Sequence, residues 1–130
     1  MLTNIEILKR IDKITEEDKR YKKEAYLFIL AALEYTLSKL PARRHLTGRE
    51  LAIGIAEYAR KEYGYMAKMV LEKWGVAKTI DYGEIVYHMI DQEIMTKTED
   101  DKKEDFADVY DFEEEFHLKH LNPSDFPERF

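Results

Sequence analysis

Cysteine is absent from this sequence of 130 residues, and serine, asparagine and glutamine are almost absent. Without cysteine the chain can form no disulfide, no cysteine-ligated zinc site, no iron–sulfur cluster and no thiol nucleophile. The two serines are Ser38, late in a helical pattern, and Ser124, near the C-terminus. Neither lies on a strand-to-helix turn of the kind that carries the nucleophile of a serine hydrolase. These absences exclude several common classes of enzyme.

Long hydrophobic runs are also scarce. The run from Ala25 to Leu33 has nine residues, which is too short to cross a bilayer. Residues 1–14 mix apolar and charged side chains at helical spacing, without the uninterrupted apolar core of a signal peptide. We therefore expect a cytoplasmic protein that makes no use of a membrane.

The remaining composition is that of a globular domain. Apolar residues make up 45% of the chain and charged residues 37%, and the length suits one domain. Abundant glutamate and lysine beside scarce asparagine and glutamine are typical of proteins from hot environments. The net charge of −6 is uneven, because residues 96–130 carry twelve acidic against five basic side chains. The acidity is thus a property of the C-terminal quarter.

Apolar residues recur every three or four positions in five segments, which predicts five helices. The segments are residues 2–14, 21–40, 47–63, 65–74 and 81–95. The helix over residues 21–40 contains the nine-residue apolar run, so we expect it at the centre of the fold and covered on nearly every side.

Helix boundaries are marked by capping residues. Thr3 with Glu6, and Thr47 with Glu50, have the spacing of capping boxes, and Asp81 with Glu84 repeats it. We expect Asp18 to cap the central helix. Three stop signals follow helical patterns, namely Pro41, Gly64 and Gly75.

Residues 96–116 form an acidic, aromatic-rich arm for which two structures are predicted. The arm pairs with residues 94–98 as a small β-hairpin, as in a winged-helix fold, or Asp111 caps a helix that runs to about His120, and the two can coexist. The expected fold is therefore mainly α, a compact single-domain bundle of about five helices over residues 1–120, followed by an irregular tail over residues 121–130.

Several blocks of the sequence together resemble a known family. The blocks are Arg20-Tyr21, Ala25-Tyr26, Arg44 to Gly48, Glu50-Leu51, Trp74-Gly75, Asp81 to Val86, and Asp105-Phe106 through Phe112. In their order and spacing they resemble a family of short conserved hypothetical proteins of unknown function, described chiefly from planctomycete and verrucomicrobial bacteria. The resemblance runs from about Arg20 to Phe116. It implies a single domain and no catalytic or ligand-binding residue.

A basic loop at the start of the third helix is the first candidate site. A helix N-terminus presents free amides and a partial positive charge, and nearby guanidinium groups would complete a receptor for phosphate, carboxylate or a nucleic-acid backbone. The candidate residues are Arg43, Arg44, His45, Thr47, Gly48 and Arg49. In the alternative interpretation these side chains are solvated or pair with the acidic arm.

The polar face of the helix over residues 81–95 is the second candidate site, as an interface for a protein partner. It carries Asp81, Glu84, Tyr87, His88 and Asp91. With no lysine or arginine between residues 81 and 95, this face would be repelled by DNA, which argues against the DNA-binding mode of a winged helix.

Two sets of side chains have spacing that suits a metal ion. Glu113, His117 and His120 would share one face of a helix, as would Glu84, His88 and Asp91. Such spacing is also common on solvated helices, and the second Glu-x-x-His of a di-iron bundle is missing, as are HExxH, the Walker A motif and the dinucleotide glycine fingerprint. We therefore expect no metal and no cofactor.

The function predicted from the sequence is a non-enzymatic protein-interaction module. Its binding surface would be the acidic helix face, the aromatic rim or the arm. The alternative is a module that binds nucleic acid or a phosphorylated ligand through residues 43–49, and self-association into a homo-oligomer is compatible with both.

Overall fold

The structure is a computed structural model that describes residues 1–117. Its elements are α1 (Asn4–Glu17), α2 (Lys23–Ser38), α3 (Gly48–Tyr63), the 3-10 turn η1 (Gly64–Met66), α4 (Ala67–Lys73), α5 (Thr79–Asp91), the 3-10 turn η2 (Lys103–Phe106) and the single turn α6 (Phe112–Glu115). The predicted mainly helical fold with five principal helices is confirmed. No helix in the described part of the chain has the length and apolarity needed to span a membrane.

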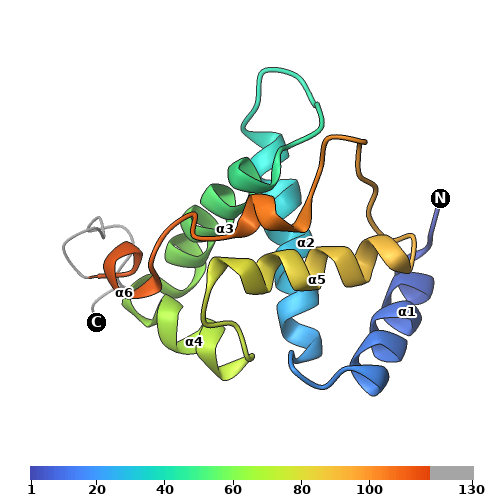
Figure 1. Cartoon of the computed structure of the whole chain (residues 1–130), viewed down its shortest axis with the longest axis horizontal. Helices are drawn as coiled ribbons and strands as arrows, with labels where there is room; N and C mark the ends of the chain where they lie inside the picture. Colours follow the sequence, from blue (N-terminus) through green and yellow to red (C-terminus); the bar gives the residue numbers. More distant parts are fainter. Residues whose placement is uncertain (118–130) are drawn as a thin grey trace, which may run out of the picture.

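Helices α2 and α3 together form the centre of the molecule. Helix α2 contacts α1, α3 and α5, and α3 also contacts α4 and both 3-10 turns (Figure 1). The expectation that α2 is covered on nearly every side holds except for one strip that the surrounding elements leave open. Leu27 is 38% exposed and Ala31 is also exposed, although Tyr26 and Ile29 are buried.

Helices α2 and α3 pack closely because Gly54 has no side chain. A Cβ atom at Gly54 would overlap the Oγ1 atom of Thr36 on α2. Thr36 itself is tied to its own helix, since its hydroxyl donates to the carbonyl of Ala32 at 2.7 Å. The distance between the two central helices is therefore set by a glycine on one and a threonine on the other.

The predicted helix starts at Thr3 and Thr47 are confirmed as capping boxes. In each box the threonine hydroxyl accepts from the backbone of a glutamate three residues later, whose carboxylate accepts from the threonine backbone. The predicted stops are also confirmed, since α2 ends before Pro41 and both Gly64 and Gly75 adopt positive φ angles.

Two predicted caps are wrong. Asp18 is the C-cap of α1, and the residue before α2 is Lys22. The carboxylate of Asp18 instead accepts hydrogen bonds from the backbone and guanidinium of Arg20. Asp81 does not begin α5 but lies in its first turn, where its carboxylate accepts from the backbone amides of Ala77 and Lys78 at 2.9 and 3.0 Å. An acidic side chain in the first turn of a helix can therefore accept hydrogen bonds from free backbone amides, just as an N-cap side chain does.

The predicted β-hairpin of a winged helix is wrong, because residues 1–117 contain no strand. Helix α5 ends at Asp91, earlier than predicted, and Glu93 follows with a φ angle of 59°. The amides of Glu93 and Ile94 then donate to the carbonyls of Ile90 and Met89 at 2.9 and 2.8 Å. This closed helix end turns residues 94–98 away from an extended path.

The predicted acidic arm is also not a separate element, since its aromatic side chains belong to the core. Phe106, Phe112 and Phe116 are buried, and the hydroxyl of Tyr110 donates to the carbonyl of Ala52 on α3 at 2.9 Å. Asp111 does cap a helix, as predicted, but α6 ends at Glu115. His120 and the predicted tail over residues 121–130 lie outside the described residues.

The close packing of α2 on α3 predicts that Gly54→Ala destabilises the protein. At an exposed helical position, alanine stabilises a helix by about 1 kcal/mol relative to glycine. At Gly54 the added methyl group must displace Thr36, and overpacking of this kind costs about 1–3 kcal/mol. We expect a lower free energy of unfolding by chemical denaturation. A second substitution, Thr36→Ala, should recover part of the loss, and an unchanged or higher stability of Gly54→Ala alone would contradict the prediction.

A candidate binding pocket between α2, α3 and α5

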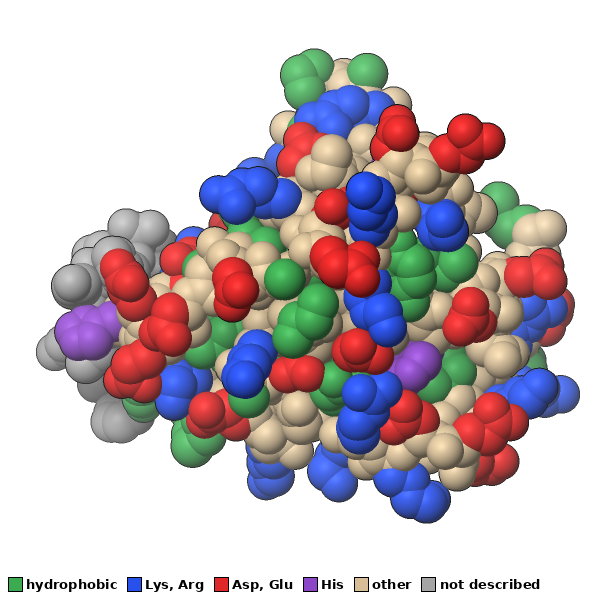
Figure 2. All heavy atoms as spheres, in the orientation of Figure 1, with side chains coloured by type: hydrophobic (Ala, Val, Ile, Leu, Met, Phe, Trp, Pro, Cys, Tyr) green, Lys and Arg blue, Asp and Glu red, His purple; other side chains and the backbone are tan. Residues whose placement is uncertain are grey.

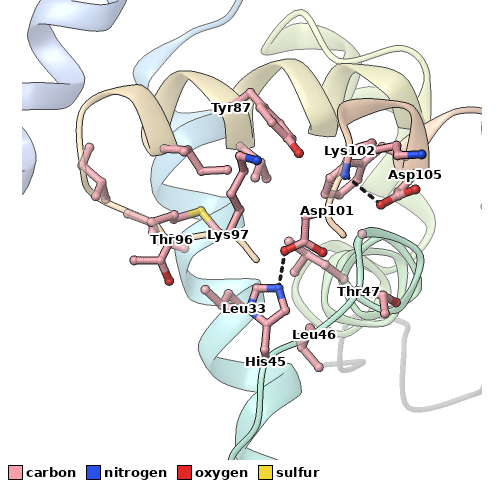
Figure 3. Close-up of a pocket in the computed structure, with 18 of the residues that line it drawn as sticks. Leu33, His45, Leu46, Thr47, Tyr87, Thr96, Lys97, Asp101, Lys102 and Asp105 are labelled. Carbon is pink, nitrogen blue, oxygen red and sulfur yellow. Dashed lines mark hydrogen bonds and ion pairs between the residues drawn. The ribbon is translucent and has the colours of Figure 1, made fainter. Parts of the chain in front are cut away.

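A pocket of about 330 Å³ lies where α2, the start of α3 and α5 meet the segment that follows α5. Its size is at the lower end of the range for ligand sites in proteins. Figure 3 shows side chains from the 45–47 loop, from α5 and from residues 96–105 directed around one space. The pocket is thus built from segments that are far apart in the sequence.

The floor of the pocket is apolar. Its apolar lining residues are Leu30, Leu33, Leu37, Leu46, Leu51, Val86, Ile90, Ile94, Met95 and Phe106. Those from α2 are spaced by three and four residues, so they form one stripe on that helix. An apolar group that enters the pocket would move from water onto a surface formed mainly by leucine and isoleucine side chains. Burial of apolar surface is favourable by about 25 cal/mol for each Å² buried.

Tyr87 is the polar residue of this pocket with an unsatisfied group. Its Oη atom is buried and has no hydrogen-bond partner among the residues that the structure describes. Burial raises the pKa of Tyr87, and the nearby carboxylates of Asp101, Asp105 and Glu104 raise it further. The hydroxyl is therefore a protonated donor at neutral pH. A buried donor without an acceptor costs about 1–3 kcal/mol.

Asp101 joins two loops at the edge of the pocket. Its Oδ2 atom accepts from the backbone amide of Thr98 at 2.8 Å and lies 2.5 Å from Nε2 of His45 (Figure 3). Burial alone would raise the pKa of Asp101, but these two hydrogen bonds outweigh it and hold the pKa below its usual value. The contact closes the pocket on the side of the 43–47 loop.

The lysines at the pocket edge have no such partners. Lys97 and Lys102 line the pocket and are exposed, and neither forms an ion pair within residues 1–117. In Figure 3 the side chain of Lys97 extends in the direction of Tyr87. The pocket edge therefore carries two ammonium groups without a bound carboxylate.

The predicted anion site is arranged differently from the expected open receptor. Arg43 forms two hydrogen bonds with Glu34, at 2.7 and 3.3 Å, and Arg44 forms two with Glu50, at 3.0 and 2.7 Å. His45 contacts Asp101, and the Thr47 capping box occupies two of the amides at the start of α3, those of Thr47 and Glu50. Gly48 is buried under Phe106.

Arg49 is exposed and makes no ion pair within the described chain. Anion binding here stays a prediction, and a guest anion would compete with two carboxylates already in place.

The acidic face of α5, predicted as a partner interface, is largely occupied by contacts within the chain. Asp81 accepts from the hydroxyl of Tyr21 at 2.6 Å, and Glu84 pairs with Arg20 and Lys103, each at 3.3 Å. His88 lies 2.8 Å from the hydroxyl of Tyr26 and 3.3 Å from Asp18. Asp91 is exposed, and Tyr87 lines the pocket.

The predicted metal-like set of Glu84, His88 and Asp91 forms no cluster, and in the set of Glu113, His117 and His120 the last residue lies outside the described residues. Within residues 1–117 no group of three histidine, aspartate or glutamate side chains is placed to hold a metal ion. Glu113 pairs with Lys68 at 3.2 Å, and His117 follows the end of α6, so the continuous helix expected for this spacing is absent up to that point.

The pocket unites residues from both predicted sites. Arg44, His45, Thr47 and Gly48 come from the basic loop and Tyr87 from the α5 face, whereas Arg43, Arg49, Asp81, Glu84, His88 and Asp91 are not among its lining residues. Nothing in the sequence indicates that Lys97, Asp101 and Lys102 would join them, because these residues lie in a charged segment without periodicity. Their proximity to the basic loop depends on the path of the chain after α5.

The surface around the pocket carries both signs of charge. Figure 2 shows basic and acidic side chains intermixed on this face, with hydrophobic side chains visible between α5 and the segment that follows it. A broad basic area, the usual electrostatic footprint of a nucleic-acid site, is not present on the face shown.

The unsatisfied hydroxyl of Tyr87 predicts an unusual result for a buried tyrosine. Tyr87→Phe should leave the free energy of unfolding unchanged or raise it, because it removes a buried donor that has no acceptor. Tyr82→Phe is the matched control. The hydroxyl of Tyr82 lies 2.7 Å from that of Tyr110, so its removal should cost about 1 kcal/mol. Equal losses in the two variants, measured by chemical denaturation, would contradict this account.

The Arg44–Glu50 pair predicts a pH-dependent contribution to stability. The guanidinium of Arg44 and the backbone amide of Thr47 lower the pKa of Glu50 from 4.5 to about 2. The stabilisation is therefore complete above pH 4.5 and is lost as the pH falls towards 2. We expect Glu50→Gln to lower the free energy of unfolding by about 1 kcal/mol at pH 6, with a difference that shrinks as the pH approaches 2. A difference independent of pH would show that the charge of Glu50 does not contribute.

Comparisons of the chain with protein-family models, with curated proteins and with solved structures found no match. The resemblance to the family of conserved hypothetical proteins therefore stays a prediction from the sequence.

Proposed function

We propose that the protein is a non-enzymatic protein-interaction module whose partner inserts an apolar side chain into the pocket between α2, α3 and α5. The observation that supports this most directly is the composition of the pocket. Its floor is formed by ten apolar side chains, and charged residues such as Arg44, Lys97 and Asp101 stand at its edge. An apolar pocket with a polar rim is the usual form of an energetic hot spot in a protein interface.

This proposal places the binding surface away from the acidic face of α5. Asp81, Glu84 and His88 form hydrogen bonds and ion pairs that join α5 to α2 and to the loop before it. A partner that used these side chains would break contacts that hold the fold together. The pocket offers contacts that the chain itself does not use, above all the hydroxyl of Tyr87.

Selection of peptides from a random library displayed on phage tests the proposal. We expect binders that share one bulky aliphatic or aromatic residue. Leu33→Trp places extra volume in the pocket and should abolish their binding, whereas Leu27→Trp, on the exposed strip of the same helix, should leave binding unchanged. Leu37→Trp serves as a second pocket variant if Leu33→Trp does not fold, as judged by circular dichroism. Failure to enrich any peptide, or equal binding to Leu33→Trp and Leu27→Trp, would overturn the proposal.

A further inference from the structure

Tyr87 and Lys97 place hydrogen-bond donors without acceptors beside an apolar floor. Tyr87 Oη is buried without a partner, and Lys97 lacks an ion pair within residues 1–117. Both residues line the pocket, Tyr87 from α5 and Lys97 from the segment after it, and Figure 3 shows Lys97 extending in the direction of Tyr87. The hydroxyl of Tyr87 therefore lacks an acceptor, and the exposed ammonium of Lys97 is available to pair with an anion.

The chain's own carboxylates at this edge are already occupied by backbone amides. Asp101 accepts from the amide of Thr98 at 2.8 Å, and Asp105 accepts from the amide of Lys102 at 3.0 Å. Asp101 also contacts His45. These bonds fix both aspartates within their own loop, while the ammonium groups of Lys97 and Lys102 have no carboxylate bound.

We infer that the group recognised by the pocket is the C-terminal residue of a partner chain, with its apolar side chain on the leucine floor and its terminal carboxylate bound by Tyr87 and Lys97. This inference rests on the proposed function and specifies the partner. A chain end is the place in a protein where a carboxylate and an apolar side chain share one residue. Its carboxylate accepts charge-assisted hydrogen bonds, which are stronger than those between neutral groups.

The size and openness of the pocket agree with one residue at the end of a longer chain. About 330 Å³ is at the lower limit for a ligand site. The edge formed by Arg44, Lys97, Asp101 and Lys102 is polar and exposed or half-buried, so the remainder of the partner chain would leave the pocket over a solvated rim. Capture of a terminal carboxylate is one of the established modes of peptide recognition in proteins.

Three N-acetylated tetrapeptides test the inference, with binding to the full chain followed by NMR chemical-shift titration at millimolar concentrations. They are Gly-Gly-Gly-Leu with a free carboxylate, the same peptide as its carboxamide, and Gly-Gly-Gly-Ala with a free carboxylate. We expect the leucine acid to bind about tenfold more tightly than its amide, a difference equal to about one charge-assisted hydrogen bond. It should also bind more tightly than the alanine acid, and the shifts should map to pocket residues.

Three variants separate recognition of the terminal carboxylate from general effects of a substitution on peptide binding. Tyr87→Phe and Lys97→Met should each bring the acid and the amide closer in affinity, and Tyr87→Phe should do so without loss of stability. Lys19→Met removes the same charge at an exposed position outside the pocket and should preserve the preference for the acid.

Other results of the peptide titrations would contradict the inference, the proposed function or both. Equal affinity for the leucine acid and its amide would overturn the terminal-carboxylate inference and leave the proposed function standing. Equal affinity for the leucine and alanine acids, or no binding of any peptide, would overturn the proposed function as well. Free 4-methylpentanoate that binds as tightly as the leucine peptide would overturn the assignment to a chain end.

Discussion

The contact of Phe106 with two glycines is the constraint on which the pocket depends. A Cβ atom at Gly48 or at Gly83 would come within 3.0 and 3.1 Å of the Phe106 ring, which is buried. The absence of side chains on α3 and α5 at these positions lets η2 lie against both helices. With Phe106 fixed there, the chain before it must bridge from the end of α5 to η2, and this bridge forms the outer wall of the pocket.

Polar contacts fix the position of that wall more closely. The Asp101–His45 contact joins the bridge to the loop before α3, and the Thr98 and Lys102 amides hold its own turns. The result is an apolar floor, largely from α2 and α5, beside an edge of long, exposed lysines. This combination, together with the unsatisfied hydroxyl of Tyr87, supports the proposed recognition of a small apolar group that carries an acceptor.

Most of the charged clusters that the sequence singles out as candidate sites are paired within the chain. Arg43 and Arg44 each meet a glutamate, and the acids of α5 meet Tyr21, Arg20 and Lys103. Most charged groups of the two predicted sites therefore have a partner within the chain, which the sequence could not show, whereas Arg49 and Asp91 are exposed. Lys97 and Lys102 lie in a segment without any motif, and only their position beside the pocket distinguishes them from other surface lysines.

The sequence by itself determined what depends on neighbours along the chain. The capping boxes at Thr3 and Thr47 and the stops at Gly64 and Gly75 are local features, and each is present as predicted. The tertiary structure decided what depends on distant segments. The hairpin was wrong because the end of α5 closes on itself at Glu93, and the aromatic residues after Phe106 became core because α3 and α5 leave space for them. The pocket belongs to this second class, since the proximity of Tyr87, Lys97 and the leucines of α2 follows from packing and not from spacing.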